Sequence, residues 1–219
     1  MTKSKIIGIF GCEQTDICIY LASILENMKL HVLVMDYSFE QKMQFCIPSP
    51  EKNLKVVTHK NVDYMLHCDG KEWPQQEYDF MIINLGSWPQ EEAFSQCDEL
   101  IGVMNCEFAQ IVNYRELIEK IERPMSIIFR NYCKNYMDAK KISLQLGDTN
   151  CFVGDRIFLP FSEADECSRL AMQTDGYRNF TSISKEFEKA LFRICRTVSN
   201  QEFARVMTGM QRAKKGECF

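Results

Sequence analysis

Short apolar runs alternate with longer amphipathic segments along almost the whole chain. Apolar runs of about four to eight residues are typical of strands buried on both faces, and such runs occur at residues 5–10, 31–36, 54–57, 78–84, 97–104, 125–129 and 156–161. Apolar residues at helical spacing predict helices at residues 17–28, 61–68, 107–122, 135–146, 162–172 and 184–198. This alternation predicts an α/β fold, a doubly wound and mostly parallel sheet with helices on both faces, and a single domain over residues 1–219.

The turn after the first predicted strand has the position of a phosphate-binding loop but lacks most of its residues. Such a loop needs glycines whose neighbouring amides wrap phosphate, a lysine that reaches it, and a hydroxyl for Mg²⁺. Here Gly11 and Thr15 are kept, while Glu13 and Gln14 stand where the second glycine and the lysine would fall. The next strand ends in Asp36, a candidate metal or base residue or a simple turn cap. The turn is therefore either an altered phosphate site or an inactive one.

Composition narrows the class of protein. The 219 residues are 46% apolar and 26% charged with a net charge of −4, so nucleic acid, which favours a basic surface, is not the expected partner. Eleven cysteines without a C-x-x-C pair favour free thiols in a reducing cytoplasm and no metal site. The first ten residues lack a signal-peptide pattern, and no apolar run reaches the roughly 18 residues of a membrane span.

Residues 200–219 predict an amphipathic, basic C-terminal tail. Apolar residues recur at helical spacing among basic ones, which is typical of a helix lying on a membrane surface. The same pattern is typical of a terminal helix packed on its own domain or docked on a partner. The apolar positions are Phe203, Val206, Met207 and Met210, and the basic ones are Arg205, Arg212, Lys214 and Lys215.

Three further segments carry a family resemblance. Residues 78–84 read Tyr-Asp-x-x-Ile-Ile-Asn, residues 97–103 read Cys-Asp-x-x-Ile-x-Val, and Pro160 lies within Leu-Pro-Phe. In this order, together with residues 5–36, they resemble the ParA/MinD family of deviant-Walker P-loop ATPases. The resemblance implies a P-loop NTPase-like fold of the SIMIBI/MinD type, with Pro160 near the base-binding end of the nucleotide site.

The resemblance also shows what is missing from that site. The signature lysine near the start of the loop has no counterpart, and Gln14 takes the position of the second, invariant-type lysine. Asn84 takes the place of the aspartate that organises Mg²⁺, and the loop is about three residues shorter. Loss of a phosphate-neutralising cation and of a metal-positioning carboxylate removes the main electrostatic elements of phosphoryl transfer. We therefore expect a pseudo-ATPase without catalytic residues or a required cofactor, in which ATP and Mg²⁺ bind only if the altered loop still holds phosphate. Its vestigial nucleotide site would comprise Gly11, Gln14, Thr15, Asp36, Asn84 and Pro160.

Three functions remain open. The leading hypothesis is a non-catalytic scaffold or localisation factor in bacterial pilus or secretion assembly, as implied by the degenerate TadZ/CpaE-type members of the family. It would bind a protein partner, form a homodimer, and touch the inner face of the cell membrane through residues 200–219. The second hypothesis is a nucleotide-binding ATPase switch that holds phosphate with Thr15, Asp36 and the loop amides. The third is a DNA partition accessory protein that uses a basic patch at Arg130, Lys134, Lys140 and Lys141.

Overall fold

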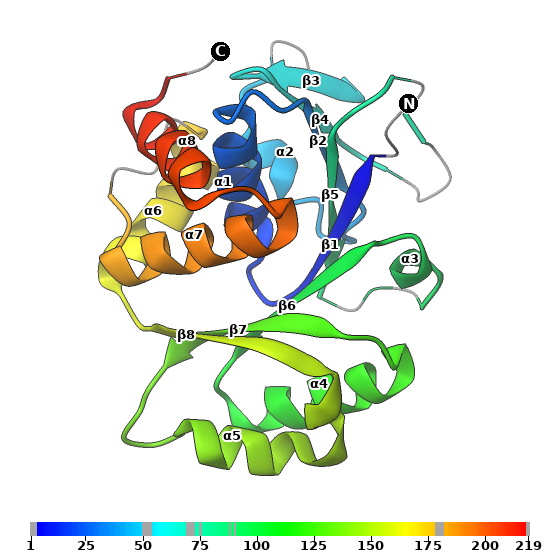
Figure 1. The fold of residues 1–219 in the computed structure, drawn as a ribbon, viewed down its shortest axis with the longest axis vertical. Helices are drawn as coiled ribbons and strands as arrows, with labels where there is room; N and C mark the ends of the chain where they lie inside the picture. The colour runs from blue at the N-terminus through cyan, green and yellow to red at the C-terminus, as the bar shows by residue number, and fades with distance from the viewer. Residues whose placement is uncertain are drawn as a thin grey trace.

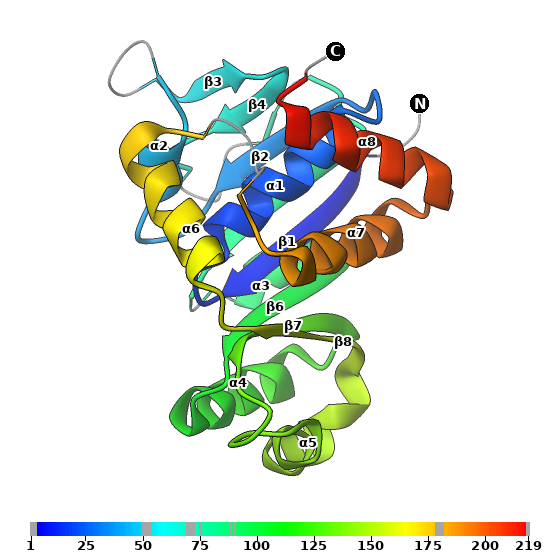
Figure 2. The same ribbon diagram turned by 90° about the vertical axis from the view of Figure 1, so that its left-hand side faces the viewer.

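The computed structural model describes residues 4–49, 54–68, 73–74, 76–87, 89, 91–177 and 182–217, and these form an eight-stranded sheet between two layers of helices (Figures 1 and 2). The strand order is β3-β4-β2-β5-β1-β6-β7-β8, and every pairing is parallel except that of β3 with β4 at one edge. The doubly wound α/β fold predicted from the sequence is confirmed.

The strands are β1 (Lys5–Gly11), β2 (Val32–Asp36), β3 (Val56–His59), β4 (Val62–Met65), β5 (Phe80–Gly86), β6 (Glu99–Asn105), β7 (Met125–Tyr132) and β8 (Val153–Pro160). The helices are α1 (Thr15–Glu26), α2 (Met43–Cys46), α3 (Glu91–Ser95), α4 (Phe108–Ile121), α5 (Ala139–Leu146), the 3₁₀ segment η1 (Gly147–Phe152), α6 (Glu163–Asp175), α7 (Lys185–Ser199) and α8 (Phe203–Lys215).

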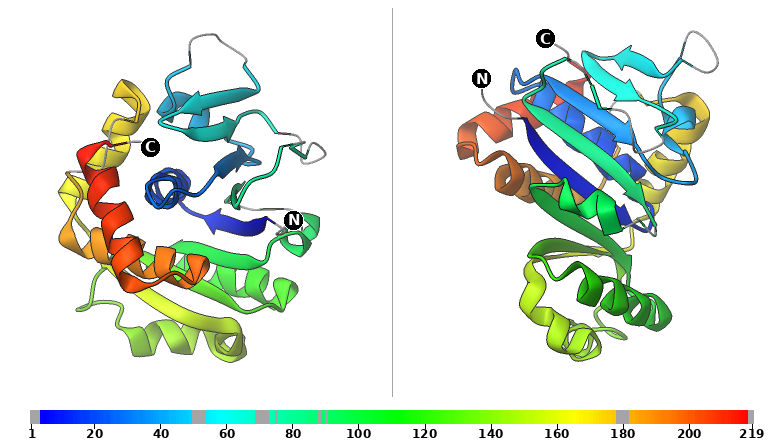
Figure 3. Two further views of the ribbon diagram at one scale, coloured as in Figure 1. Left: turned by 45° about the horizontal axis from the view of Figure 1, so that its top comes forward. Right: turned by 90° about the vertical axis from the view of Figure 1, so that its right-hand side faces the viewer.

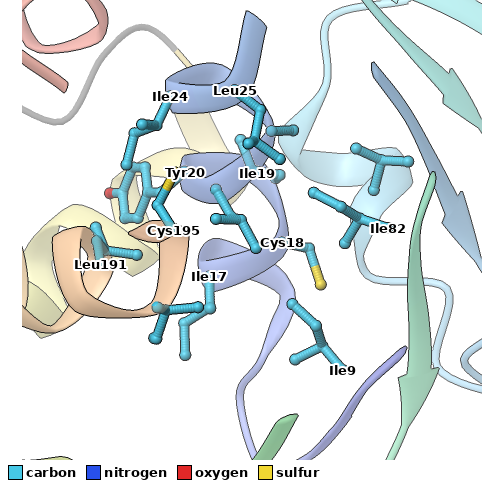
Figure 4. Close-up of a cluster of buried hydrophobic side chains, with 14 of the residues drawn as sticks. Ile9, Ile17, Cys18, Ile19, Tyr20, Ile24, Leu25, Ile82, Leu191 and Cys195 are labelled. Carbon is cyan, nitrogen blue, oxygen red and sulfur yellow. The ribbon is translucent and has the colours of Figure 1, made fainter. Parts of the chain in front are cut away.

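The sheet separates two hydrophobic cores. Alternate residues of each central strand point to opposite faces, so that Ile7 and Ile9 enter the core under α1 while Ile6 and Phe10 enter the core under α4. Helix α1 is buried along its whole length, because the sheet lies on one side of it and α7 and α8 lie on the other. Figure 4 shows this packing, with Ile9 and Ile82 from the sheet and Leu191 and Cys195 from α7 on opposite sides of α1.

One predicted helix is wrong. Within residues 61–68 the structure has strand β4, joined to β3 by a tight turn in which Lys60 and Asn61 both have positive φ, at 49° and 57°. This left-handed pair is the backbone of a two-residue hairpin turn. Period-two alternation then puts Val62 and Tyr64 in the core, while Asp63 between them accepts a 2.5 Å hydrogen bond from the Thr58 hydroxyl. The other predicted strands and helices are present, with boundaries shifted by a few residues.

The predicted C-terminal tail is a helix docked on the domain. In α8 the side chains of Val206, Met210 and Ala213 are buried, and the helix lies against α1 and beside α7 (Figure 3). Part of the apolar face that favoured membrane contact is therefore covered by α1, whereas Phe203 at its start is 55% exposed. Among the described residues, no helix has both the length and the apolar character needed to cross a bilayer.

Close approach of α8 to α1 depends on Gly209. A Cβ at this position would lie 2.5 Å from Met28 Cγ and 2.9 Å from the carbonyl oxygen of Ile24. We predict that Gly209→Ala lowers the free energy of unfolding by about 1–3 kcal/mol, because the added carbon overpacks a helix contact. In open space the same substitution would raise stability by about 1 kcal/mol, so urea denaturation tests the sign. Thr208→Ala, at an exposed position of the same helix, serves as the control and should show no loss.

Candidate functional site

Five of the six predicted site residues lie together at the carboxyl edge of the sheet. Gly11, Asp36 and Asn84 are at the ends of the neighbouring strands β1, β2 and β5. Gln14 and Thr15 stand at the start of α1, which follows β1 directly. The sixth, Pro160, is exposed at the end of β8, three strands away from β1, and is not part of this group.

The buried polar side chains of the group bond to one another. Gln14 Nε2 donates to Asn84 Oδ1 at 2.8 Å, and Asn84 Nδ2 donates to Asp36 Oδ1 at 2.9 Å. Gln14 is 5% exposed, and the other two are fully buried. Gln14, which the resemblance aligns with a lysine, thus turns inward and bonds to Asn84, which it aligns with an aspartate.

The Asp36 carboxylate is saturated with donors. Besides Asn84, Oδ1 accepts from the backbone N–H and the hydroxyl of Ser38 at 3.1 and 2.6 Å, and Oδ2 accepts from the N–H of Met43 at 3.2 Å. Burial raises the pKa of Asp36, and the hydrogen bonds from Ser38 oppose that shift. This arrangement is that of a carboxylate which fixes the turn between β2 and α2, so a metal ion would have to replace donors already in place.

A buried ion pair lies beside this group. The Arg130 guanidinium, from β7, donates to both carboxylate oxygens of Asp16 at 2.9 Å, and the two side chains are 2% and 1% exposed. It also donates to the carbonyl oxygen of Glu13 at 2.6 Å and lies over the ring of Phe187, 5.3 Å from its centroid. Burial alone would lower the pKa of Arg130, but the charge and hydrogen bonds of Asp16 outweigh burial and hold that pKa above its usual value.

These contacts use the groups that would otherwise bind an anion. A helix N-terminus attracts phosphate through its free amides, yet in α1 the Asp16 carboxylate lies in the first turn and accepts from the N–H of Ile17 at 2.8 Å. The N–H of Cys12, in the preceding loop, donates to the carbonyl oxygen of Val103 at 2.8 Å. The N-terminus of α1 therefore already holds an anion and its countercation, both supplied by the protein.

Gly11 is needed for the turn itself. Its φ is 114°, and a Cβ there would lie 2.0 Å from the carbonyl oxygen of Val103. Only glycine fits such a close approach at a positive φ. Its presence is therefore explained by chain geometry, without a phosphate.

The described residues at the start of α1 form only a small hollow. The hollow there has a volume of about 10 Å³, which is room for one water molecule, whereas small-molecule pockets usually measure about 300–1,000 Å³. A second ion pair closes it, between the Glu13 carboxylate and Arg169 of α6 at 3.2 Å. The hollow is lined by Glu13, Thr15, Asp16, Lys42, Cys46, Arg169, Met172 and Gln173.

The basic patch predicted for DNA is wrong in one essential residue. Arg130 is buried in its ion pair and cannot reach a phosphate backbone, although Lys134, Lys140 and Lys141 are exposed. The sequence analysis also missed Asp16 as a site residue. A usable signal existed. Arg130 directly follows the apolar run at residues 125–129, and an arginine buried at the end of such a strand requires an acidic partner.

Metal ligands do not gather in the described part of the chain. No group of three His, Cys, Asp or Glu side chains there is arranged to hold an ion, and its ten cysteines are free thiols. Burial raises the pKa of Cys46 and of Cys97 to about 12, so both thiols stay protonated at neutral pH.

We predict that Arg130→Met lowers the free energy of unfolding by about 3–5 kcal/mol, because it leaves the Asp16 carboxylate buried without its partner. The double variant Arg130→Met/Asp16→Asn should recover more than half of that loss, since no unpaired charge remains. Urea denaturation at pH 7 measures both effects. Arg115→Met, which breaks an exposed pair with Glu119 at 3.8 Å, should cost less than about 1 kcal/mol; an equal cost for Arg115 and Arg130 would contradict the role of burial.

We predict that Asn84→Asp, which restores the carboxylate expected from the resemblance, destabilises the fold by about 1–3 kcal/mol at pH 7. The new carboxylate would face Asp36 Oδ1 at the 2.9 Å now bridged by the Asn84 amide. Because the native pair then holds a proton with a raised pKa, the loss should be small near the unfolded pKa of about 4 and grow as pH rises. Thermal unfolding between pH 4.5 and 8 measures it. Asn105→Asp is the control, because Asn105 Oδ1 only accepts, from Asn131 at 3.3 Å; a pH-independent loss at position 84 would refute this explanation.

No family model and no curated protein matches this sequence. Solved structures do match. MinD in the MinC–MinD cell division complex of Aquifex aeolicus has a TM-score of 0.65 at 14% identity, over 91% of this chain and 97% of that one. A putative plasmid partition protein of Borrelia burgdorferi with bound AMPPNP has a TM-score of 0.56 at 13% identity, over 96% and 99%. The ParA of pNOB8 bound to nonspecific DNA has a TM-score of 0.52 at 12% identity, over 95% and 99%. The eight-stranded, mostly parallel sheet and its helices therefore give this chain the fold of the ParA and MinD ATPases.

Proposed function

We propose that this protein is a non-catalytic ParA/MinD-like pseudo-ATPase that acts as a scaffold or localisation factor. The observation that carries the proposal is the buried Arg130–Asp16 pair at the N-terminus of α1. In a P-loop the protein supplies the cation and the nucleotide supplies the anion. Here Arg130 and Asp16 supply both charges from within the protein. The polar chain from Gln14 through Asn84 to Asp36 does the same at the expected metal position.

Competition with these contacts argues against nucleotide binding. A phosphate at the start of α1 would have to displace the Asp16 carboxylate from Arg130 and from the helix amide. Breaking a buried pair in this way costs about 3–5 kcal/mol, before the repulsion from Glu13 is counted. A nucleotide switch would therefore need the loop and β7 to rearrange together.

The carboxyl edge of the sheet is suited to binding a protein. Three phenylalanines follow strand ends there and are strongly exposed: Phe39 after β2 at 99%, Phe108 after β6 at 58%, and Phe161 after β8 at 65%. Exposed aromatic side chains are typical anchors of protein interfaces. This edge would bind a second copy of the chain or another protein, in keeping with a role in bacterial pilus or secretion assembly at the inner face of the membrane. MinD, which shares the fold, is seen in complex with the protein MinC.

Calorimetry with ATP and ADP in the presence of Mg²⁺ tests the proposal. We predict no binding at millimolar nucleotide and no thermal stabilisation, because the phosphate position is already filled. Micromolar binding that Thr15→Ala weakens would contradict the proposal and favour a switch with an altered P-loop. Thr208→Ala, an exposed threonine on α8, is the matched control and should behave as the wild type.

A further inference from the structure

Charge is distributed very unevenly along this chain. Residues 185–215, which span α7 and α8, contain eight Lys or Arg and three Asp or Glu, a net charge of +5. The whole chain carries −4, so the remaining residues carry −9. In Figures 1 and 2 the two helices lie side by side on the surface of the molecule, and they contact each other. One layer of an otherwise acidic protein is therefore basic.

Four cations of α7 form a straight row. At about 100° per residue, Lys185, Lys189, Arg193 and Arg196 fall within about 80° of one another, directly opposite the buried face of the helix. All four are exposed, and the row is about 16 Å long at the helical rise of about 1.5 Å per residue. We call these four residues the α7 cation row.

Most of this row is not neutralised. Only Arg193 has an ion pair among the described residues, with Asp155 of β8. The nearby Glu188 carboxylate is itself engaged by Lys214 of α8 at 2.5 Å. Lys185, Lys189 and Arg196 thus present three charges that the described part of the protein does not pair.

An aromatic pair borders the row on the side of α8. The rings of Phe192 and Phe203 meet edge to face with centroids 5.0 Å apart, and Phe203 is 55% exposed. On α7, Phe192 is adjacent to the cation row around the helix. Aromatic side chains beside arginine and lysine are typical of the residues that anchor protein interfaces.

We propose that the α7 cation row and the Phe192–Phe203 pair bind an acidic helical segment of a partner protein. A helix with carboxylates at matching i, i+4, i+8 and i+11 positions would pair along the row, and an apolar side chain beside them would rest on Phe203. This binding proposal extends the scaffold role proposed above and rests on it. The binding surface itself includes no residue of the expected nucleotide site.

Size and shape favour a short acidic helix over other polyanions. Duplex DNA is charged along its whole length, whereas the basic segment here is confined to α7 and α8 and the rest of the chain carries a net charge of −9. A membrane surface needs several apolar side chains that insert, whereas on α8 Phe203 is exposed and Val206, Met210 and Ala213 are buried.

Fluorescence anisotropy with three labelled probes, without nucleotide, tests the proposal. The probes are a capped helical peptide of about 16 residues with glutamates at the matching positions and one leucine, a duplex DNA of about 20 base pairs, and vesicles containing phosphatidylglycerol. We predict that the peptide binds tightest, that Lys189→Glu/Arg196→Glu weakens it about tenfold or more, and that Phe203→Ala weakens it several-fold.

Lys120→Glu/Lys140→Glu is the matched control, because it makes the same change of net charge at exposed positions on α4 and α5. It should leave peptide binding nearly unchanged. Equal losses in the two double variants, or tighter binding of DNA or vesicles than of the peptide, would overturn the proposal. Nucleotide binding by calorimetry would contradict only the pseudo-ATPase assignment, so the two proposals fail separately.

Discussion

The buried guanidinium of Arg130 is the constraint on which the carboxyl edge of the sheet depends. A charge that is 2% exposed must find acceptors inside the protein, and it finds them in Asp16 and in the carbonyl oxygen of Glu13. These bonds tie β7 to α1 and to the loop before it, and Glu13 is held with φ at 53° where its carbonyl meets Arg130. Through Phe187 the same side chain also contacts α7. One cation thus fixes the relative positions of four segments.

The same requirement is met in the polar group at the ends of β1, β2 and β5. Parallel strands bring polar side chains together at their carboxyl ends, where a nucleotide and a metal would normally satisfy them. Here Gln14, Asn84 and Asp36 satisfy one another. Because an unsatisfied buried polar group costs about 1–3 kcal/mol, these mutual bonds stabilise the carboxyl edge of the sheet from within the protein. The loss of phosphate and metal binding that we propose would follow from the same set of bonds.

The sequence predicted the strands and helices of the sheet well because each central strand is a continuous apolar run bounded by polar residues. It failed at β4, where Val62 and Tyr64 alternate with polar positions over too few residues to separate a strand from a short helix. It grouped Gly11, Gln14, Thr15, Asp36 and Asn84, and the structure brings these five residues together because strand ends in a parallel sheet share one edge. It could not pair Arg130 with Asp16, since 114 residues separate them and only the strand order brings β7 near α1. Pro160 was placed near the base-binding end by resemblance alone, and it lies at the end of β8, three strands from β1.

Helix α8 shows a limit of sequence patterns that also bears on function. A helix that packs on its own domain and one that lies on a membrane have the same alternation of apolar and basic residues. What separates them here is Gly209, whose missing side chain lets α8 approach Met28 and Ile24 of the α1 region closely. Once the apolar face is buried in this way, the cations that remain outside join those of α7 on one surface. Charges such as Arg130 that the protein pairs internally serve the fold, whereas Lys185, Lys189 and Arg196 are exposed on one side of α7 and are the charges that we propose pair with a partner. The two proposals therefore place function on the outer helices and the exposed aromatic edge, and not at the start of α1.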